Sequence, residues 1–98
     1  MSKTYIVVDA KSTDPERMAE YRRLSSIAAD KFGGRFLVRG GAYEVLEGGW
    51  RPQRLVVIEF DNKAMAKAFY DSPEYMAARK QRAGVSSFDM VLVEGCSM

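Results

Sequence analysis

The chain has 98 residues, which is enough for one domain with a modest hydrophobic core but not for two. Hydrophobic residues make up 47% of the chain and charged residues 29%, a composition that is typical of globular proteins and excludes disorder. The net charge of +2 is too small to indicate a nucleic-acid or membrane-surface protein, and the absence of histidine excludes Ser-His-Asp and Cys-His nucleophile systems, the HExxH zinc site and histidine-ligated haem. We therefore expect a single domain over residues 1–98, with an ordered core at about residues 4–94.

The first predicted elements are a short strand and a long helix. Residues 5–10 are rich in β-branched side chains, which favour a strand. Asp14 then suits the N-cap of a helix and Pro15 its first position, and apolar residues recur after them at spacings of three and four. The pattern predicts a helix at about residues 15–32, which the glycine pair 33–34 ends.

A β region interrupted by glycines follows. Residues 35–39 predict a second strand, and residues 54–60 (RLVVIEF) predict the strongest strand of the chain. Between them, the glycine pair 40–41 predicts a bulge or a tight bend with a positive φ, because no helix begins after it to make a phosphate loop. Residues 43–46 are predicted to resume extended structure, and residues 50–52 to form a loop.

The last third of the chain predicts a broken helix and a final strand. Asn62 offers an N-cap for a helix at about residues 62–71. Ser72 and Pro73 then cap and restart the helix over residues 73–83. After Gly84, residues 85–94 predict the last strand.

The predicted order of elements is β-α-β-β-α-β, which is typical of the α+β class and of the ferredoxin-like fold. This fold is a four-stranded antiparallel sheet with both helices on one face, because right-handed crossovers place the two helices on the same side. The sequence therefore predicts one helix-covered face and one open face of the sheet.

The predicted strands are apolar on both faces, unlike those of a half-solvated sheet. In the first strand Ile6 and Val8 occupy one face and Val7 the other, and in the last strand Val91 and Val93 oppose a second set of apolar residues. A monomer rarely leaves such an apolar face exposed. We therefore predict a homodimer formed sheet to sheet; the alternative occupant of the open face is an unrelated partner or RNA.

Two stretches, FLVRGGAYEVLEGGWRPQRLVVIEF and YDSPEYMAARKQR, resemble the bacterial family named domain of unknown function 1330, and the resemblance extends over essentially the whole chain. It implies a dimeric α+β barrel, in agreement with the two apolar faces. It implies no chemistry, because the family has no assigned activity. Folds of this kind also include cofactor-independent monooxygenases, lactone isomerases and haem enzymes, but a shared fold does not fix function.

Candidate ligand-binding residues surround the glycine bend. Arg39 and Arg54 come from strands expected to be neighbours, and Trp50 lies in the loop between them. The planar, two-pronged guanidinium group suits a carboxylate or an enolate. The alternative is that these arginines form structural ion pairs with Glu44 or Glu59 across the strands.

Without histidine, a general base would have to be a strand carboxylate, and the strand segments contain four: Asp9, Glu44, Glu59 and Asp89. Glu44 is the first choice because it follows the bend, although nearby arginines would lower its pKa and so favour binding over catalysis. Tyr75 is an aromatic residue with a polar group that could line the same pocket, or could instead only pack there. The predicted pocket therefore contains the following residues: Arg39, Glu44, Trp50, Arg54 and Tyr75.

Other ligand classes have no matching pattern. No carboxylate or thiolate cluster has metal-ligand spacing, and no glycine-rich dinucleotide motif is present, so we expect neither a metal nor a cofactor. The strand RLVVIEF lacks the base-stacking aromatics of an RNA-binding sheet, so nucleic acid is not an expected partner. Cys96 is expected to be a free thiol, and without a membrane-spanning or cleavable apolar segment the expected location is the cytoplasm.

Two functions remain from the sequence. The first is a homodimeric module that binds a small anionic or carbonyl compound without turnover. The alternative is a cofactor-independent enzyme, similar to a monooxygenase or an isomerase, that acts on a small carbonyl or aromatic substrate. A deep, partly polar cavity with a carboxylate of raised pKa would favour the enzyme.

Overall fold

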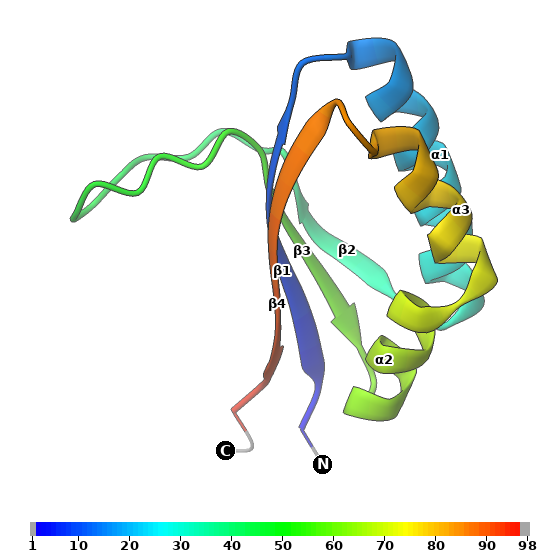
Figure 1. Ribbon diagram of the computed structural model, residues 1–98. Coiled ribbons are helices and arrows are strands. Elements are labelled where there is room, and N and C mark those ends of the chain that lie inside the picture. The colour runs from blue at the N-terminus through cyan, green and yellow to red at the C-terminus, as the bar shows by residue number, and fades with distance from the viewer. Residues whose placement is uncertain (1, 97–98) are drawn as a thin grey trace.

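The computed structural model describes residues 2–96 and has one sheet and one layer of helices (Figure 1). In chain order the elements are β1 (Thr4–Ser12), α1 (Pro15–Lys31), β2 (Arg35–Arg39), β3 (Leu55–Phe60), α2 (Lys63–Asp71), α3 (Pro73–Arg82) and β4 (Ser86–Glu94). The four strands lie in the order β2-β3-β1-β4, and each pair of neighbours is antiparallel. The predicted ferredoxin-like arrangement is confirmed, with α2 and α3 as the two pieces of the predicted broken helix.

Local capping interactions explain where the helices begin and end. The Asp14 side chain accepts a hydrogen bond from the Arg17 amide at 3.1 Å and so caps α1. Gly33, with φ of +75°, follows the end of that helix. Ser72 separates α2 from α3: its hydroxyl donates to the carbonyl of Phe69 at 2.7 Å and accepts from the Tyr75 amide at 3.0 Å. The predicted break at this position is confirmed.

The hydrophobic core lies between the helices and one face of the sheet. Every second residue of β1 points into it, including Ile6 and Val8. From the helical side, Phe69 packs between Phe60 and Tyr75, with ring centroids 5.2 Å and 4.7 Å away. These aromatic contacts connect α2 and α3 to the sheet.

The opposite face of the sheet has no helix over it (Figure 1), and its centre is apolar, while Glu59 and Asp89 lie on the same face nearer its ends. A row of three valines crosses its centre, because Val7 of β1 lies opposite Val57 of β3 on one side and Val91 of β4 on the other. On the outer strands the apolar side chains are exposed, Val91 by 60% of its surface. We call this surface the open face.

The loop between β2 and β3 departs from the prediction. Residues 43–46 form no strand; residues 41–50, which we call the arm, leave the sheet on the side of the open face and project away from it (Figure 1). The prediction of extended structure as part of the sheet was wrong because a strand needs a hydrogen-bonding neighbour. The returning segment contains Pro52, which has no amide hydrogen to donate, and the turn contains Gly48, with φ of +84°.

An ion-pair network lies at the end of the sheet opposite the arm, and it predicts that the stability of the protein falls in acid. Arg35 bonds Glu59 at 2.9 Å and Asp61 at 3.1 Å, Lys3 bonds Asp61 at 2.8 Å, and the Tyr5 hydroxyl donates to Glu59 at 3.0 Å. The bond from Arg35, followed by that from Tyr5, lowers the pKa of Glu59; bonds from Lys3 and Arg35 lower the pKa of Asp61. Carboxyls with a lowered folded-state pKa stabilise the protein above their ordinary pKa, and this contribution is lost as the pH falls through the lowered values.

We therefore expect Arg35→Met to reduce the loss of unfolding free energy between neutral pH and about pH 3, as measured by urea unfolding. Arg51→Met is the matched control, because Arg51 makes no ion pair among the described residues. An unchanged pH dependence in Arg35→Met would contradict the assignment of acid sensitivity to this network.

Candidate functional site

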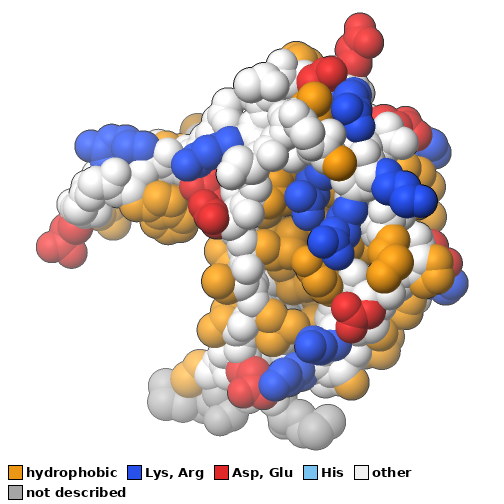
Figure 2. Space-filling model, in the orientation of Figure 1, with side chains coloured by type: hydrophobic (Ala, Val, Ile, Leu, Met, Phe, Trp, Pro, Cys, Tyr) orange, Lys and Arg blue, Asp and Glu red, His pale blue; other side chains and the backbone are white. Residues whose placement is uncertain are grey.

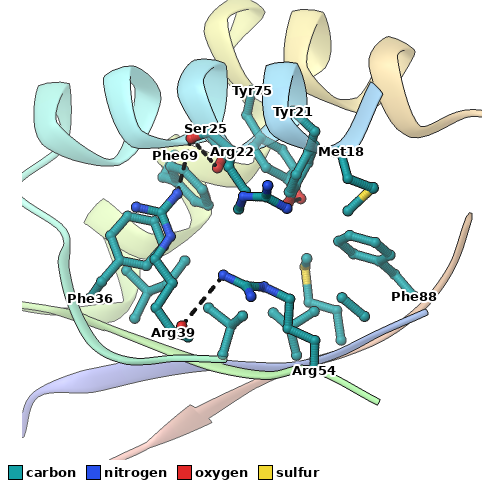
Figure 3. A pocket seen from close by; sticks show the side chains of 15 residues that line it. Met18, Tyr21, Arg22, Ser25, Phe36, Arg39, Arg54, Phe69, Tyr75 and Phe88 are labelled. Atoms are coloured by element: carbon teal, nitrogen blue, oxygen red, sulfur yellow. Dashed lines mark hydrogen bonds between the residues drawn. The ribbon is translucent and has the colours of Figure 1, made fainter. Parts of the chain in front are cut away.

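A small cavity lies inside the protomer, between α1 and the helix-facing side of the sheet (Figure 3). About 30 Å³ of it is open to the centres of water molecules, which is room for one or two of them. Its walls are mostly apolar and aromatic, formed by side chains of α1, α2, α3 and all four strands, among them Met18, Phe36, Phe69, Phe88 and Met90. The cavity is therefore a site for a small chemical group and not for a large molecule.

Three arginines from different elements converge on this cavity (Figure 3). Arg22 comes from α1, Arg39 ends β2, and Arg54 directly precedes β3. Arg39 donates to the carbonyl of Arg22 at 2.9 Å, and Arg54 makes a longer contact of 3.4 Å with the carbonyl of Arg39. Among residues 2–96, none of the three forms an ion pair with an acidic side chain.

The positive charges of the three arginines repel one another, and burial together with this repulsion lowers the pKa values of two of them. Partial burial lowers the pKa of Arg39, and the positive charges of Arg54 and Arg22 lower it further. Burial also lowers the pKa of Arg54, with Arg22 as the second cause. The guanidinium of Arg39 lies 3.9 Å from the ring centre of Phe36, a cation–π contact that fixes its plane. An anion placed among these groups would relieve their mutual repulsion.

Gly40 positions Arg54. Its φ is +74°, which confirms the predicted bend with a positive φ, and its amide donates to the Leu55 carbonyl at 2.8 Å. A Cβ atom at this position would collide with the guanidinium of Arg54. Glycine thus serves both the backbone conformation and the close approach of the arginine.

The inner end of the cavity has a pair of tyrosine hydroxyls. The hydroxyls of Tyr21 and Tyr75 are 2.8 Å apart and buried. Burial, followed by the neighbouring Tyr75, raises the pKa of Tyr21 well above its ordinary value, so this phenol stays protonated. One proton joins the two oxygens, which leaves one hydroxyl hydrogen of the pair available to a carbonyl or carboxylate oxygen.

The structure brings some of the predicted site residues together and separates others. Arg39, Arg54 and Tyr75 line the cavity. Glu44 and Trp50 lie on the arm instead, where Trp50 donates from its indole nitrogen to Asp9 at 3.2 Å. This separation follows from the arm: residues predicted to continue the sheet leave it, and so they leave the pocket of their own protomer.

Arg22 is a cavity residue that was not among the site residues predicted from the sequence. Its position holds a signal, because Arg22 lies four residues after Met18 and three before Ser25, both of which are buried. Helical spacing therefore places Arg22 on the edge of the buried stripe. The four strand carboxylates considered as bases are absent from the cavity lining.

The cavity opens toward a basic surface. Figure 2 shows basic side chains gathered over a hydrophobic hollow between the sheet and the helical layer. An open hollow of about 290 Å³ adjoins the cavity there, and Arg22, Gly40 and Arg54 line it. Within residues 2–96, no group of three or more His, Cys, Asp or Glu side chains is placed to hold a metal ion, and no helix is long and apolar enough to cross a membrane. The arrangement is suited to an anion with a small apolar or carbonyl part.

The family model described as Domain of unknown function (DUF1330) matches residues 3–96. The chain belongs to this family. No curated protein matches the sequence of this DUF1330 domain. The resemblance inferred from the RGG and DSPEY segments is confirmed.

Solved structures share the fold of the DUF1330 domain at low identity. A protein of unknown function from Rhodopseudomonas palustris matches with a TM-score of 0.76 and 16% identity, over 99% of this chain and 85% of the other. A dimeric ferredoxin-like protein of unknown function from Jannaschia sp. CCS1 has a TM-score of 0.69 and 15% identity, over 94% and 98%. SnoaB, a cofactor-independent oxygenase from Streptomyces nogalater, has a TM-score of 0.58 and 13% identity, over 100% and 97%. These identities show a common fold alone.

Proposed function

We propose that the DUF1330 domain is a homodimer closed through its open faces, and that each protomer binds a small anionic or carbonyl compound at Arg22, Arg39 and Arg54. The dimer is supported by the uncovered apolar face and by the similar Jannaschia protein, which is described as dimeric. The ligand site is supported by the cavity between α1 and the sheet. This cavity lies on the opposite side of the sheet from the proposed dimer interface.

The observation that carries the ligand proposal is the set of three converging guanidinium groups without an acidic partner among residues 2–96. Positive charges held this close repel one another, so their arrangement needs a reason outside the stability of the fold. Arginine binds carboxylates through two parallel hydrogen bonds, and Arg39 is already oriented by Phe36 and by the Arg22 carbonyl. A preorganised site of this kind favours a planar anion.

The dimensions of the site restrict the ligand. The cavity of about 30 Å³ accepts only a few atoms, so a small carbonyl or methyl group fits inside and the rest of the ligand lies in the outer hollow. The hydroxyl pair of Tyr21 and Tyr75 offers one hydrogen bond at the inner end. A short 2-oxo acid, with its carboxylate at the arginines and its carbonyl side in the cavity, meets these conditions.

The geometry supports binding better than catalysis. The similarity to SnoaB is compatible with a cofactor-independent enzyme, but no carboxylate lines the described cavity to act as a base. The tyrosine pair has a high proton affinity at Tyr21, which makes it a hydrogen-bond donor and not a base at neutral pH. We therefore propose a ligand-binding module, with the enzyme as the alternative.

A thermal-shift experiment with pyruvate tests the proposal, with acetate and neutral acetone as comparison compounds. At about ten times its dissociation constant a ligand adds ~1.4 kcal/mol, which for a domain of this size raises Tm by roughly 6–10 °C. We expect Arg54→Met to lose this shift, while its Tm without ligand stays equal or rises, because one of three repelling charges is gone.

Arg51→Met is the matched control, since it removes the same charge from a position outside the cavity. It should keep the full response to pyruvate. Equal responses of the two variants, or no response of the wild type to any of the anions, would count against the arginine site. A response to acetone equal to that to pyruvate would show that the carbonyl and not the charge is recognised.

A further inference from the structure

The arm, residues 41–50, has no role in the proposed ligand site and makes few contacts with its own protomer. Leu46, near its tip, is 86% exposed, and Trp50, at its base, is 59% exposed. Apart from the Asp9 contacts, the Tyr43 hydroxyl donates to the Pro52 carbonyl at 2.7 Å within the loop. A segment with exposed large apolar side chains and unpaired extended backbone is stabilised only if something else covers it.

The base of the arm is fixed, and this fixes its direction. Asp9 is buried in the central strand β1 and accepts two hydrogen bonds: from the Trp50 indole at 3.2 Å and from the Gln53 amide at 3.1 Å. These bonds hold residues 50–53, which connect the arm to β3, against the sheet. The arm therefore points outward on the side of the open face (Figure 1). A preorganised segment loses less conformational entropy when it binds.

We propose that the arm is a clasp that seats on a second copy of this chain, beside the sheet-to-sheet contact; the inference rests on the proposed dimer. Both the arm and the open face lie on the same side of the protomer, so whatever covers the face also meets the arm. The similar Jannaschia protein, described as dimeric, makes a second copy the favoured occupant. A two-fold axis would give each protomer's arm the same contact on its partner.

The length and charge of the arm match a second copy. Stacked sheets lie about 10 Å apart, whereas the six extended residues 41–46 span up to about 20 Å, so the arm is long enough to cross the gap to the partner's sheet. The arm contains Glu44 and Glu47 and no basic residue, while the whole chain carries a net charge of +2. An acidic arm on an otherwise basic chain is electrostatically complementary to another copy of that chain.

The test measures dimer dissociation by sedimentation velocity over a dilution series of the full chain. Leu46→Asp, and a variant in which residues 42–49 are replaced by a two-residue Asn-Gly turn, should each raise the dissociation constant at least tenfold, with unchanged circular dichroism. Ile27→Asp is the matched control: Ile27 is also a large exposed aliphatic residue, 52% exposed, but it lies on α1. It should leave the dimer unchanged.

A cross-link locates the tip directly. In a Cys96→Ser background, which removes the native cysteine, Leu46→Cys labelled with a benzophenone maleimide should give covalent dimers on irradiation, and mass spectrometry should place the link on the other protomer. A wild type that is monomeric at micromolar concentration overturns the proposed dimer and the clasp together. A dimeric wild type whose affinity survives both arm variants, or loses as much with Ile27→Asp, overturns the clasp alone.

Discussion

Val91→Asp is expected to convert the protein from a dimer into a monomer at micromolar concentration. Val91 lies at one end of the valine row that crosses the open face, opposite Val7. It is 60% exposed in the protomer, so an aspartate there leaves the protomer fold nearly unchanged. In a sheet-to-sheet dimer the same carboxylate would be buried without a partner, which costs several kcal/mol.

The two-fold symmetry of such a dimer doubles the effect, because each copy brings one aspartate to the interface. We expect the dissociation constant to rise by at least a thousandfold, measured by light scattering or sedimentation with circular dichroism as a check on folding. Met76→Asp is the control, since Met76 is exposed on α3, in the helical layer. A Val91→Asp variant that remains dimeric would show that the open face is not the interface.

Phe69→Ala should cause the largest loss of protomer stability. Phe69 on α2 is fully buried, its ring packs against Phe60 and Tyr75, and it forms part of the cavity wall. Truncation removes these contacts and enlarges a cavity that already exists. Because few neighbouring atoms can move into the enlarged space, we expect little relaxation to offset the loss. Buried phenylalanine-to-alanine substitutions cost about 3–5 kcal/mol, which is a large part of the total stability of a small domain.

Urea unfolding measures this loss as a lower midpoint, with the slope showing whether the transition stays two-state. Ile27→Ala removes a large apolar side chain from the helix surface and should change stability by less than about 0.5 kcal/mol. A loss of under about 1 kcal/mol in Phe69→Ala would mean that the site collapses, and that the aromatic cluster does not connect the helices to the sheet as described.

The two largest effects separate the two apolar faces of the sheet. Phe69→Ala acts on the helix-covered face and should lower the stability of each protomer, whereas Val91→Asp acts on the open face and should change association. Arg54→Met should change neither strongly, because its partners are other arginines. This separation makes the fold, the dimer and the ligand site independently testable.

Much of the fold was predictable because its signals are local. Asp14, Pro15 and Ser72 have side-chain chemistry that places helix ends wherever they occur, and Gly40 has the positive φ expected of a glycine within a strand pattern. The strands have apolar residues on both faces, and because successive side chains in a strand point to opposite sides, this pattern likewise indicated an apolar face that the helices do not cover.

The site was only partly predictable, because it depends on which residues meet across the fold. Residues 43–46 were predicted to resume extended structure, but a strand also needs a neighbour, and the chain supplies none there. Glu44 and Trp50 therefore lie on the arm. Arg22 lines the site because it lies at the edge of the buried side of α1, and this edge packs toward Arg39 and Arg54. The packing of the helix on the sheet determines this placement. The order of elements and the two apolar faces follow from local backbone and solvation preferences, which are present in the sequence pattern. The convergence of three arginines and the anchoring of the arm by Asp9 follow from packing, since both depend on contacts between residues far apart in the chain.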